Sequence, residues 1–431
     1  MNKLNLFQNM SLVFLAFFLI FFFVYGFIVG ENSTGAGGYN GDILATFNNL
    51  QLFVNNNILE SIKLTKDHNL YYTNRPPLLY ILQSVLNPFA NDLELYRWSV
   101  FFISCLTPLF FYLSLKMNFE KVNNLALICL SLLIFLSPYY RTSSYWGLEE
   151  NYAFITLFLS FIFIKKFFYK KKILYLSFVI FFSSLCVYFD QKFIIIPIIC
   201  FFLLIYSKID IKYKIYFLIL YFLFSIPFIY LIKLWGNITP VGNMNIYQVG
   251  SRFYPHHICY MVNIFGFYMF PFIFLFTKDK IKKLFVNIIK RKVNYLLLLI
   301  AFMYLIYFLF FLDITPSYNF GGGYSYKISL FLFKNYFLQK FFLSLVFIFS
   351  FVIILIFINN NYISALFIIF FILASIFINP LLHEYVDPLI VVFFFTFSGS
   401  KIIFNIKNFF FIFFYHFVIL IVAKIYYSNI I

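Results

Sequence analysis

Residues 12–29 read LVFLAFFLIFFFVYGFIV, an apolar run of 18 residues that no charged side chain interrupts. A run of this length is sufficient for a helix that crosses the hydrocarbon core of a bilayer. Similar runs recur up to the C-terminus of the 431-residue chain, in which 63% of residues are hydrophobic and 11% are charged. Soluble domains carry about 25% charged residues. The sequence therefore predicts an integral membrane protein with many spans.

The apolar runs predict helices, because membrane β-barrels require alternating polarity along each strand. We expect an all-α fold, a polytopic transmembrane helical bundle of about 11 to 13 spans, forming a single membrane domain over residues 1–431. The first run is long for a signal-peptide core and lacks a small-residue cleavage site, so we expect it to be retained. The predicted spans lie near 8–29, 96–115, 122–138, 151–164, 173–189, 193–207, 215–234, 258–277, 293–312, 341–358, 363–379, 387–399 and 408–424.

The segments between the spans alternate in charge. One set holds 20 of the 32 basic residues and only three of the 15 acids, and the positive-inside rule assigns it to the cytoplasmic face. The opposite set, called here the outer set, holds 11 basic residues, 12 acids and four of the five histidines, while Lys424 stays unassigned. The formal charge of +17 thus reports orientation and membrane lipids, and we expect no nucleic acid partner. The outer segments are 30–95, 137–150, 235–258, 313–340 and 379–387.

Arginine also favours the outer face, with Arg75, Arg97, Arg141 and Arg252 there and Arg291 alone on the inner face. The guanidinium group is a planar fork that suits phosphate or carboxylate. We therefore treat the outer arginines as candidates for anion binding.

The first outer segment, residues 30–95, is much longer than a connection between spans requires. Its glycine-rich start leads to Asp42, which precedes an amphipathic stretch predicted to lie on the membrane surface as an interfacial helix. Two interpretations of Asp42 stay open. It either caps that helix, or it holds a carboxylate at the interface that takes a proton from an acceptor hydroxyl.

The same segment continues as TKDHNLYYTNRPPLLYIL over residues 65–82. The prolines at 76 and 77 fit the first turn of a short helix that half enters the membrane. Lys66, His68 and Arg75 precede it, either as ligands of an anionic headgroup or as ordinary interfacial side chains.

A first span, a long outer segment with an acidic residue, and a basic and aromatic stretch ending in RPPLLYIL resemble the GT-C clan of multispan glycosyltransferases. This clan includes protein O-mannosyltransferases, aminoarabinose transferases and glucosyltransferases of lipid-linked oligosaccharides. The resemblance implies use of polyprenyl-phosphate sugars on the non-cytoplasmic side. The clan usually has two adjacent acids in this segment, whereas this chain has Gly41 and Asp42.

Residues 137–154 contain Arg141 and then Glu149 with Glu150 at the head of a predicted span, which resembles the second acidic site of the clan. Simple capping of a helix N-terminus is the alternative. The carboxylate pair is also suited to a divalent metal or to an acceptor group. A turn of Asp190, Gln191 and Lys192 resembles one in the glucosyltransferases, although a plain polar turn is the interpretation that we favour.

Later outer segments supply further candidates. Arg252 with His256 or His257 is suited to donate hydrogen bonds to a phosphate oxygen. A glycine run at 321–323 is suited to a loop that closes over a donor, or equally to a flexible connection. His383, Glu384 and Asp387 resemble a short motif late in some clan members.

The resemblance and the outer residues together predict a membrane glycosyltransferase that moves a sugar from a polyprenyl-phosphate donor to a lipid-linked glycan or another envelope acceptor. We expect it in a bacterial inner membrane, with the active site facing the periplasm or exterior, no nucleotide cofactor, and a divalent metal left open. The alternatives are a lipid-linked oligosaccharide flippase or transporter, and an oligosaccharide polymerase or ligase. The predicted catalytic residues are Asp42, Glu149 and Glu150. The predicted donor-phosphate ligands are Lys66, His68, Arg75, Arg141, Arg252, His256 and His257.

Overall fold

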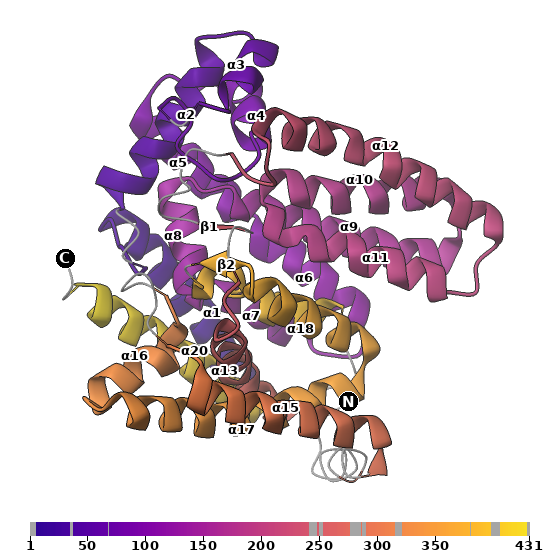
Figure 1. Ribbon diagram of the computed structural model, residues 1–431. Helices are drawn as coiled ribbons and strands as arrows, with labels where there is room; N and C mark the ends of the chain where they lie inside the picture. Colours follow the sequence, from indigo (N-terminus) through magenta and orange to yellow (C-terminus); the bar gives the residue numbers. More distant parts are fainter. Residues whose placement is uncertain are drawn as a thin grey trace. The chain divides into compact units, whose positions relative to one another are not determined.

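The structure is a computed structural model that describes residues 6–34, 38–67, 69–240, 248–249, 253–275, 286, 290–314, 321–379, 381–397 and 406–428. These residues are almost entirely helical (Figure 1), which confirms the all-α prediction. The chain forms two compact units. Unit 1 comprises Met1–Asn243 and Phe413–Ile431, and unit 2 comprises Met244–Ile412.

Unit 1 begins with the long helix α1, passes through four short helices of the first outer segment, and continues through a set of longer helices. Within it α9 packs against α10 and α6, and α1 packs against α7. Its helices are α1 (Leu6–Ile28), η1 (Tyr39–Ile43), α2 (Leu44–Val54), α3 (Ile58–Leu64), α4 (Leu78–Leu86), α5 (Leu93–Ser104), α6 (Thr107–Asn118), α7 (Asn124–Leu132), η2 (Leu133–Leu136), α8 (Pro138–Trp146), α9 (Glu150–Lys170), α10 (Ile173–Phe189), η3 (Gln191–Ile194), α11 (Ile195–Tyr206) and α12 (Ile211–Trp235).

Unit 2 packs α13 against α17 and α18, and two short strands pair antiparallel with Gln248 opposite Asn379. Helix α20 starts in unit 2, and from Phe413 onward it belongs to unit 1. The elements of unit 2 are β1 (Gln248–Val249), α13 (His257–Met269), η5 (Phe270–Leu275), α15 (Lys292–Phe311), α16 (Gly323–Leu332), α17 (Tyr336–Asn360), α18 (Tyr362–Ser375), β2 (Ile378–Asn379), η6 (His383–Tyr385), α19 (Leu389–Thr396) and the start of α20 (Ile406–Ser428).

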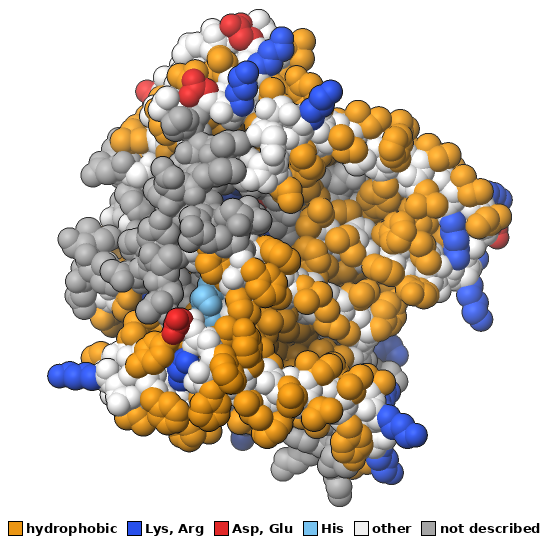
Figure 2. Space-filling view, viewed as in Figure 1, with side chains coloured by type: hydrophobic (Ala, Val, Ile, Leu, Met, Phe, Trp, Pro, Cys, Tyr) orange, Lys and Arg blue, Asp and Glu red, His pale blue; other side chains and the backbone are white. Residues whose placement is uncertain are grey.

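Eight helices in the described part of the chain are long and apolar enough to cross a membrane, and three shorter apolar helices accompany them. Figure 2 shows hydrophobic side chains covering much of the visible surface, as on α12, where Ile219, Phe222 and Ile229 are more than half exposed. Apolar surface of this kind is stable only against lipid. The chain is therefore an integral membrane protein.

The predicted span at 122–138 differs from the structure. The helix made of α7 and η2 stops at Leu136, and α8 leaves it at an angle of 76°. Pro138 cannot continue the preceding helix, while the Ser137 Oγ accepts the Tyr140 N–H and starts a new one. Residues 138–146, predicted as an outer loop, thus form a fully buried helix that ends at Gly147 with φ of 76°. With this bent pair counted as one span, the total is nine.

Two of the short predicted spans have different outcomes. The span near 151–164 extends at both ends to Glu150–Lys170, as expected for a helix that crosses the membrane. The span near 387–399 contains α19, which has only eight residues. At 1.5 Å per residue, α19 by itself is about 12 Å long and is too short to cross a bilayer, and the last two residues of the predicted span, 398 and 399, lie outside the described residues.

Candidate active site

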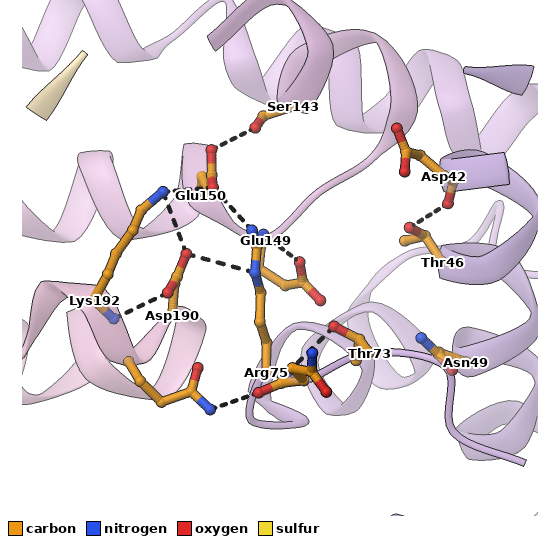
Figure 3. A network of polar contacts seen from close by, with 12 residues as sticks. Asp42, Thr46, Asn49, Thr73, Arg75, Ser143, Glu149, Glu150, Asp190 and Lys192 are labelled. Carbon is orange, nitrogen blue, oxygen red and sulfur yellow. Dashed lines mark hydrogen bonds and ion pairs between the residues drawn. The ribbon is translucent and has the colours of Figure 1, made fainter. Parts of the chain in front are cut away.

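Five charged side chains from three separate segments of unit 1 meet in what we call the charged cluster (Figure 3). Arg75 comes from the turn before α4. Glu149 and Glu150 stand at the head of α9, and Asp190 and Lys192 lie at the turn between α10 and η3.

Arg75 connects all three carboxylates of the charged cluster. Its Nη1 lies 3.0 Å from Glu149 Oε2, its Nη2 lies 2.9 Å from Glu150 Oε1, and its Nε lies 3.5 Å from Asp190 Oδ2. The Arg75 side chain is 18% exposed, whereas those of Glu149 and Glu150 are 1% and 2% exposed. The guanidinium is therefore held in a fixed orientation by buried carboxylates, while part of the Arg75 side chain reaches the surface.

Lys192 is the second cation of the charged cluster. Its Nζ lies 2.5 Å from Glu150 Oε1 and 3.5 Å from Asp190 Oδ2. Asp190 Oδ1 also accepts the backbone N–H of Lys192, so the two residues form a tight turn. Gln191 donates to the carbonyl oxygen of Asn74, which fixes this turn beside the Arg75 loop.

A chain of hydrogen bonds links Glu149 to the first outer segment. Tyr80 Oη donates to Glu149 Oε1 at 2.6 Å, Asn49 Nδ2 donates to Tyr80 Oη at 3.3 Å, and the Tyr72 N–H donates to Asn49 Oδ1. Burial and then the charge of Glu149 raise the pKa of Tyr80 well above its ordinary value, so Tyr80 stays protonated and donates. Glu149 makes no side-chain capping bond to α9. Its bonds instead serve the charged cluster.

The charged cluster contains three carboxylates and two cations, a formal charge of −1. Ser143 Oγ adds a hydrogen bond to Glu150 Oε2 at 2.7 Å. The buried carboxylates orient the two cations, and Arg75 is the member of the charged cluster that is suited to an anionic ligand approaching from the exposed side.

Asp42 lies in η1, a single π-helical turn that runs directly into α2. The interpretation of Asp42 as the N-cap of a helix is therefore wrong: Asp42 is itself helical, and its carbonyl oxygen accepts the Thr46 hydroxyl at 2.7 Å. A Cβ on Gly147 would lie 3.4 Å from Ile43 Cδ1, so η1 packs beside the residues that lead into Glu149. In the view of Figure 3, Glu149 and Arg75 lie between Asp42 and Lys192. Single π-helical turns are frequent at functional sites.

Arg141, predicted as a donor-phosphate ligand, belongs to a different set of contacts that we call the buried triad. Its Nε and Nη2 donate to the two oxygens of Glu31 at 2.7 and 2.6 Å, and Lys424 Nζ lies 2.7 Å from Glu31 Oε2. Gly26 allows this close approach, because a Cβ there would lie 2.2 Å from Arg141 Nη2. Arg141 is fully buried and also donates to two backbone carbonyls. These contacts take the place of the expected phosphate.

Charges around Glu31 determine its ionisation. Burial alone would raise the pKa of Glu31, but the hydrogen bonds and charges of Arg141 and Lys424 outweigh burial and hold the pKa below its ordinary value. Glu31 is therefore ionised at neutral pH.

The remaining predicted phosphate ligands lie elsewhere or outside the described residues. Lys66 is exposed after the end of α3. Two others, His68 and Arg252, are outside the described residues. His257 Nδ1 lies 3.1 Å from the Ser375 carbonyl oxygen in unit 2, and burial followed by the effect of His257 lowers the pKa of His256 to about 3. His256 is thus neutral at physiological pH.

The sequence interpretation missed four participants, which are Asp190, Lys192, Glu31 and Tyr80. Asp190 and Lys192 were set aside as a plain polar turn, although two opposite charges two residues apart at the end of a span were the signal for them. Glu31 stood at the start of a glycine-rich stretch that we interpreted as flexible. Tyr80 gave no signal beyond its place in RPPLLYIL.

No group of three or more His, Cys, Asp or Glu side chains within the described ranges is arranged to hold a metal ion. The chain matches no protein-family model, no curated protein and no solved structure. The case for a function therefore depends on the residues and their geometry.

Proposed function

We propose that this protein is a membrane glycosyltransferase that transfers a sugar from a polyprenyl-phosphate donor to a glycan or other acceptor on the outer face. The single observation that carries the proposal is the charged cluster, in which an arginine with an exposed side is fixed by two buried adjacent carboxylates, beside the turn that holds Asp42. The resemblance to the GT-C clan supplies the substrate class.

In the proposed reaction the acceptor hydroxyl attacks the anomeric carbon of the donor sugar. Asp42 takes the hydroxyl proton as the new carbon–oxygen bond forms, and the bond between the sugar and the phosphate breaks, leaving its electron pair on the phosphate. Arg75 then stabilises the departing phosphate through hydrogen bonds to its oxygens. The residue that acts on the attacking hydroxyl and the residue that stabilises the leaving phosphate both belong to unit 1.

Glu149 and Glu150 have a supporting role in this proposal. Their oxygens accept hydrogen bonds from Arg75, Lys192, Tyr80 and Ser143. A carboxylate that is engaged in this way orients a cation better than it removes a proton. Asp42 is therefore the better candidate for the base.

The proposal places the protein in a bacterial inner membrane with the charged cluster toward the periplasm or exterior. The experiment is to replace Asp42 with Asn and Glu149 with Gln in a strain whose surface glycan can be profiled. We expect each variant to lose one sugar from the glycan. The matched control is Glu60→Gln, since Glu60 is exposed on α3 and should leave the glycan unchanged.

An unchanged glycan in the Asp42→Asn strain, with the protein present at its usual level in the membrane, would contradict the proposal. Loss of a whole repeating unit would indicate a polymerase or ligase. Accumulation of a lipid-linked precursor on the inner face would indicate a flippase.

A further inference from the structure

Helices α1 and α20 lie side by side in unit 1. The Phe417 ring contacts the rings of Phe18 and Phe22, with centroids 5.8 and 5.7 Å away. Seven residues further along α20, Lys424 Nζ lies 5.0 Å from the centre of the Phe22 ring and 2.7 Å from Glu31 Oε2. The contacts thus advance along both helices together, which shows that α1 and α20 run parallel.

Both helices are long enough to cross the membrane. α1 has 23 residues and α20 has 23, which corresponds to about 34 Å each at 1.5 Å per residue. Glu31 follows the end of α1 by three residues and begins the first outer segment. Its contact with Lys424 cannot form if the two ends lie on opposite faces of a hydrocarbon core about 30 Å thick.

We infer that α20 crosses the membrane in the same direction as α1, so that the carboxyl end of the chain lies on the outer face with the first outer segment. This inference is independent of the proposed reaction. The charges at the other end agree with it, because Lys401 and Lys407 precede or begin α20 as Lys3 precedes α1, and basic residues of this kind mark the cytoplasmic side.

Two consequences follow for the topology. Lys424 joins the outer set, which then holds 12 basic and 12 acidic residues and is electrically neutral. With an inner N-terminus and an outer C-terminus, the number of crossings is odd. Eight crossings do not satisfy this condition. Among the described helices, either one of the eight candidates does not cross, or a further element crosses as well, such as the bent pair formed by α7 and α8 or one of the shorter apolar helices.

The test uses the full-length chain in a bacterial inner membrane with a reporter joined after Ile431. One fusion carries alkaline phosphatase, which is active only outside the cytoplasm, and the other carries green fluorescent protein, which is fluorescent only inside. We expect an active phosphatase and a loss of fluorescence. An inactive phosphatase fusion together with a fluorescent green fluorescent protein fusion would overturn the inference.

A matched pair of control fusions is placed after Tyr169, which is exposed near the end of α9 in a lysine-rich inner segment. These controls should give the opposite pattern. If the phosphatase and the green fluorescent protein are both active at both fusion sites, a Ser428→Cys variant is labelled with an impermeant maleimide. Labelling of this cysteine in intact cells supports the inference, and labelling only after permeabilisation overturns it.

Discussion

The charged cluster and the buried triad both join an arginine to glutamate in unit 1, yet they differ in exposure and in charge. Arg75 is 18% exposed and faces three carboxylates, whereas Arg141 is fully buried and shares Glu31 with Lys424. The first has an excess of acid around a partly exposed arginine. The second has an excess of base around a fully buried arginine, and its exposure is confined to Lys424, whose side chain is 29% exposed. The exposure and partners of an arginine, more than its position in a motif, therefore separate a candidate binding group from a structural one.

The largest effect is expected when the buried triad loses its arginine. In an Arg141→Met variant, Glu31 keeps only Lys424 and becomes a poorly compensated buried carboxylate. Breaking a buried pair in this way costs roughly 3–5 kcal/mol. We expect a large fall in the thermal unfolding temperature of the protein in detergent, and low levels in the membrane. The control is Arg97→Met, because Arg97 donates to two backbone carbonyls and its ion-pair partner Glu94 is 52% exposed. An equal loss of stability in that variant would contradict a specific cost of the uncompensated Glu31.

The next effect concerns activity at the charged cluster. An Arg75→Lys variant keeps the charge but loses the planar fork that meets Glu149 and Glu150. We expect sugar transfer to fall by about a hundredfold, as when a hydrogen-bond donor to a developing negative charge is removed, while the unfolding temperature stays near that of the native protein. The control is Arg97→Lys, whose side chain donates to two backbone carbonyls. Equal loss of transfer in both variants would contradict a specific role for Arg75.

A smaller effect is expected at Tyr80, which supports the charged cluster from α4. A Tyr80→Phe variant removes the hydrogen bond to Glu149 and leaves Asn49 without this acceptor. Loss of a hydrogen bond to a charged group costs about 1.5–3 kcal/mol. Chemical unfolding should show this decrease, whereas Tyr72→Phe, at an exposed side chain, should show almost none.

The smallest effect is a dependence on pH at the buried triad. The pKa of Glu31 in the folded protein is below its ordinary value, so the folded state binds its proton less readily than the unfolded state. The stabilisation is complete above the ordinary carboxyl pKa and is lost as the pH falls through the lowered value. The difference in unfolding temperature between the native protein and Glu31→Gln should therefore shrink on acidification. A constant difference would show that the charge of Glu31 contributes nothing.

Much of the fold followed from the sequence, because a run of apolar residues has few alternatives to a helix in lipid. Glu149 and Glu150 were placed correctly at the head of a helix, since that span began directly after them. Helix α8 was missed because PYYRTSSYW is polar enough to resemble a loop. Its signal was Ser137 before Pro138, a cap followed by a residue suited to the first turn.

The partners of the charged residues were beyond sequence reasoning. Lys192 meets Glu150 only because α9 and α10 pack together, and Arg141 meets Glu31 only because α8 turns by 76°. Both contacts depend on tertiary packing, which local sequence patterns do not predict. The spacing from 137 to 150 placed Arg141 and the two glutamates together along the chain, but the structure divides them between two separate sets of contacts.

The buried triad also sets an order of events during synthesis. Glu31 and Lys424 are 393 residues apart, and at about 5–20 residues per second the ribosome needs on the order of 20 to 80 s to pass from one to the other. Arg141 follows Glu31 by 110 residues, so it is made in the first third of this interval. The described residues of unit 2 are then translated before Lys424 is made. Unit 1 is therefore completed only when α20 has been synthesised. A chain that lacks α20 would leave Glu31, which is made early, without its contact to Lys424.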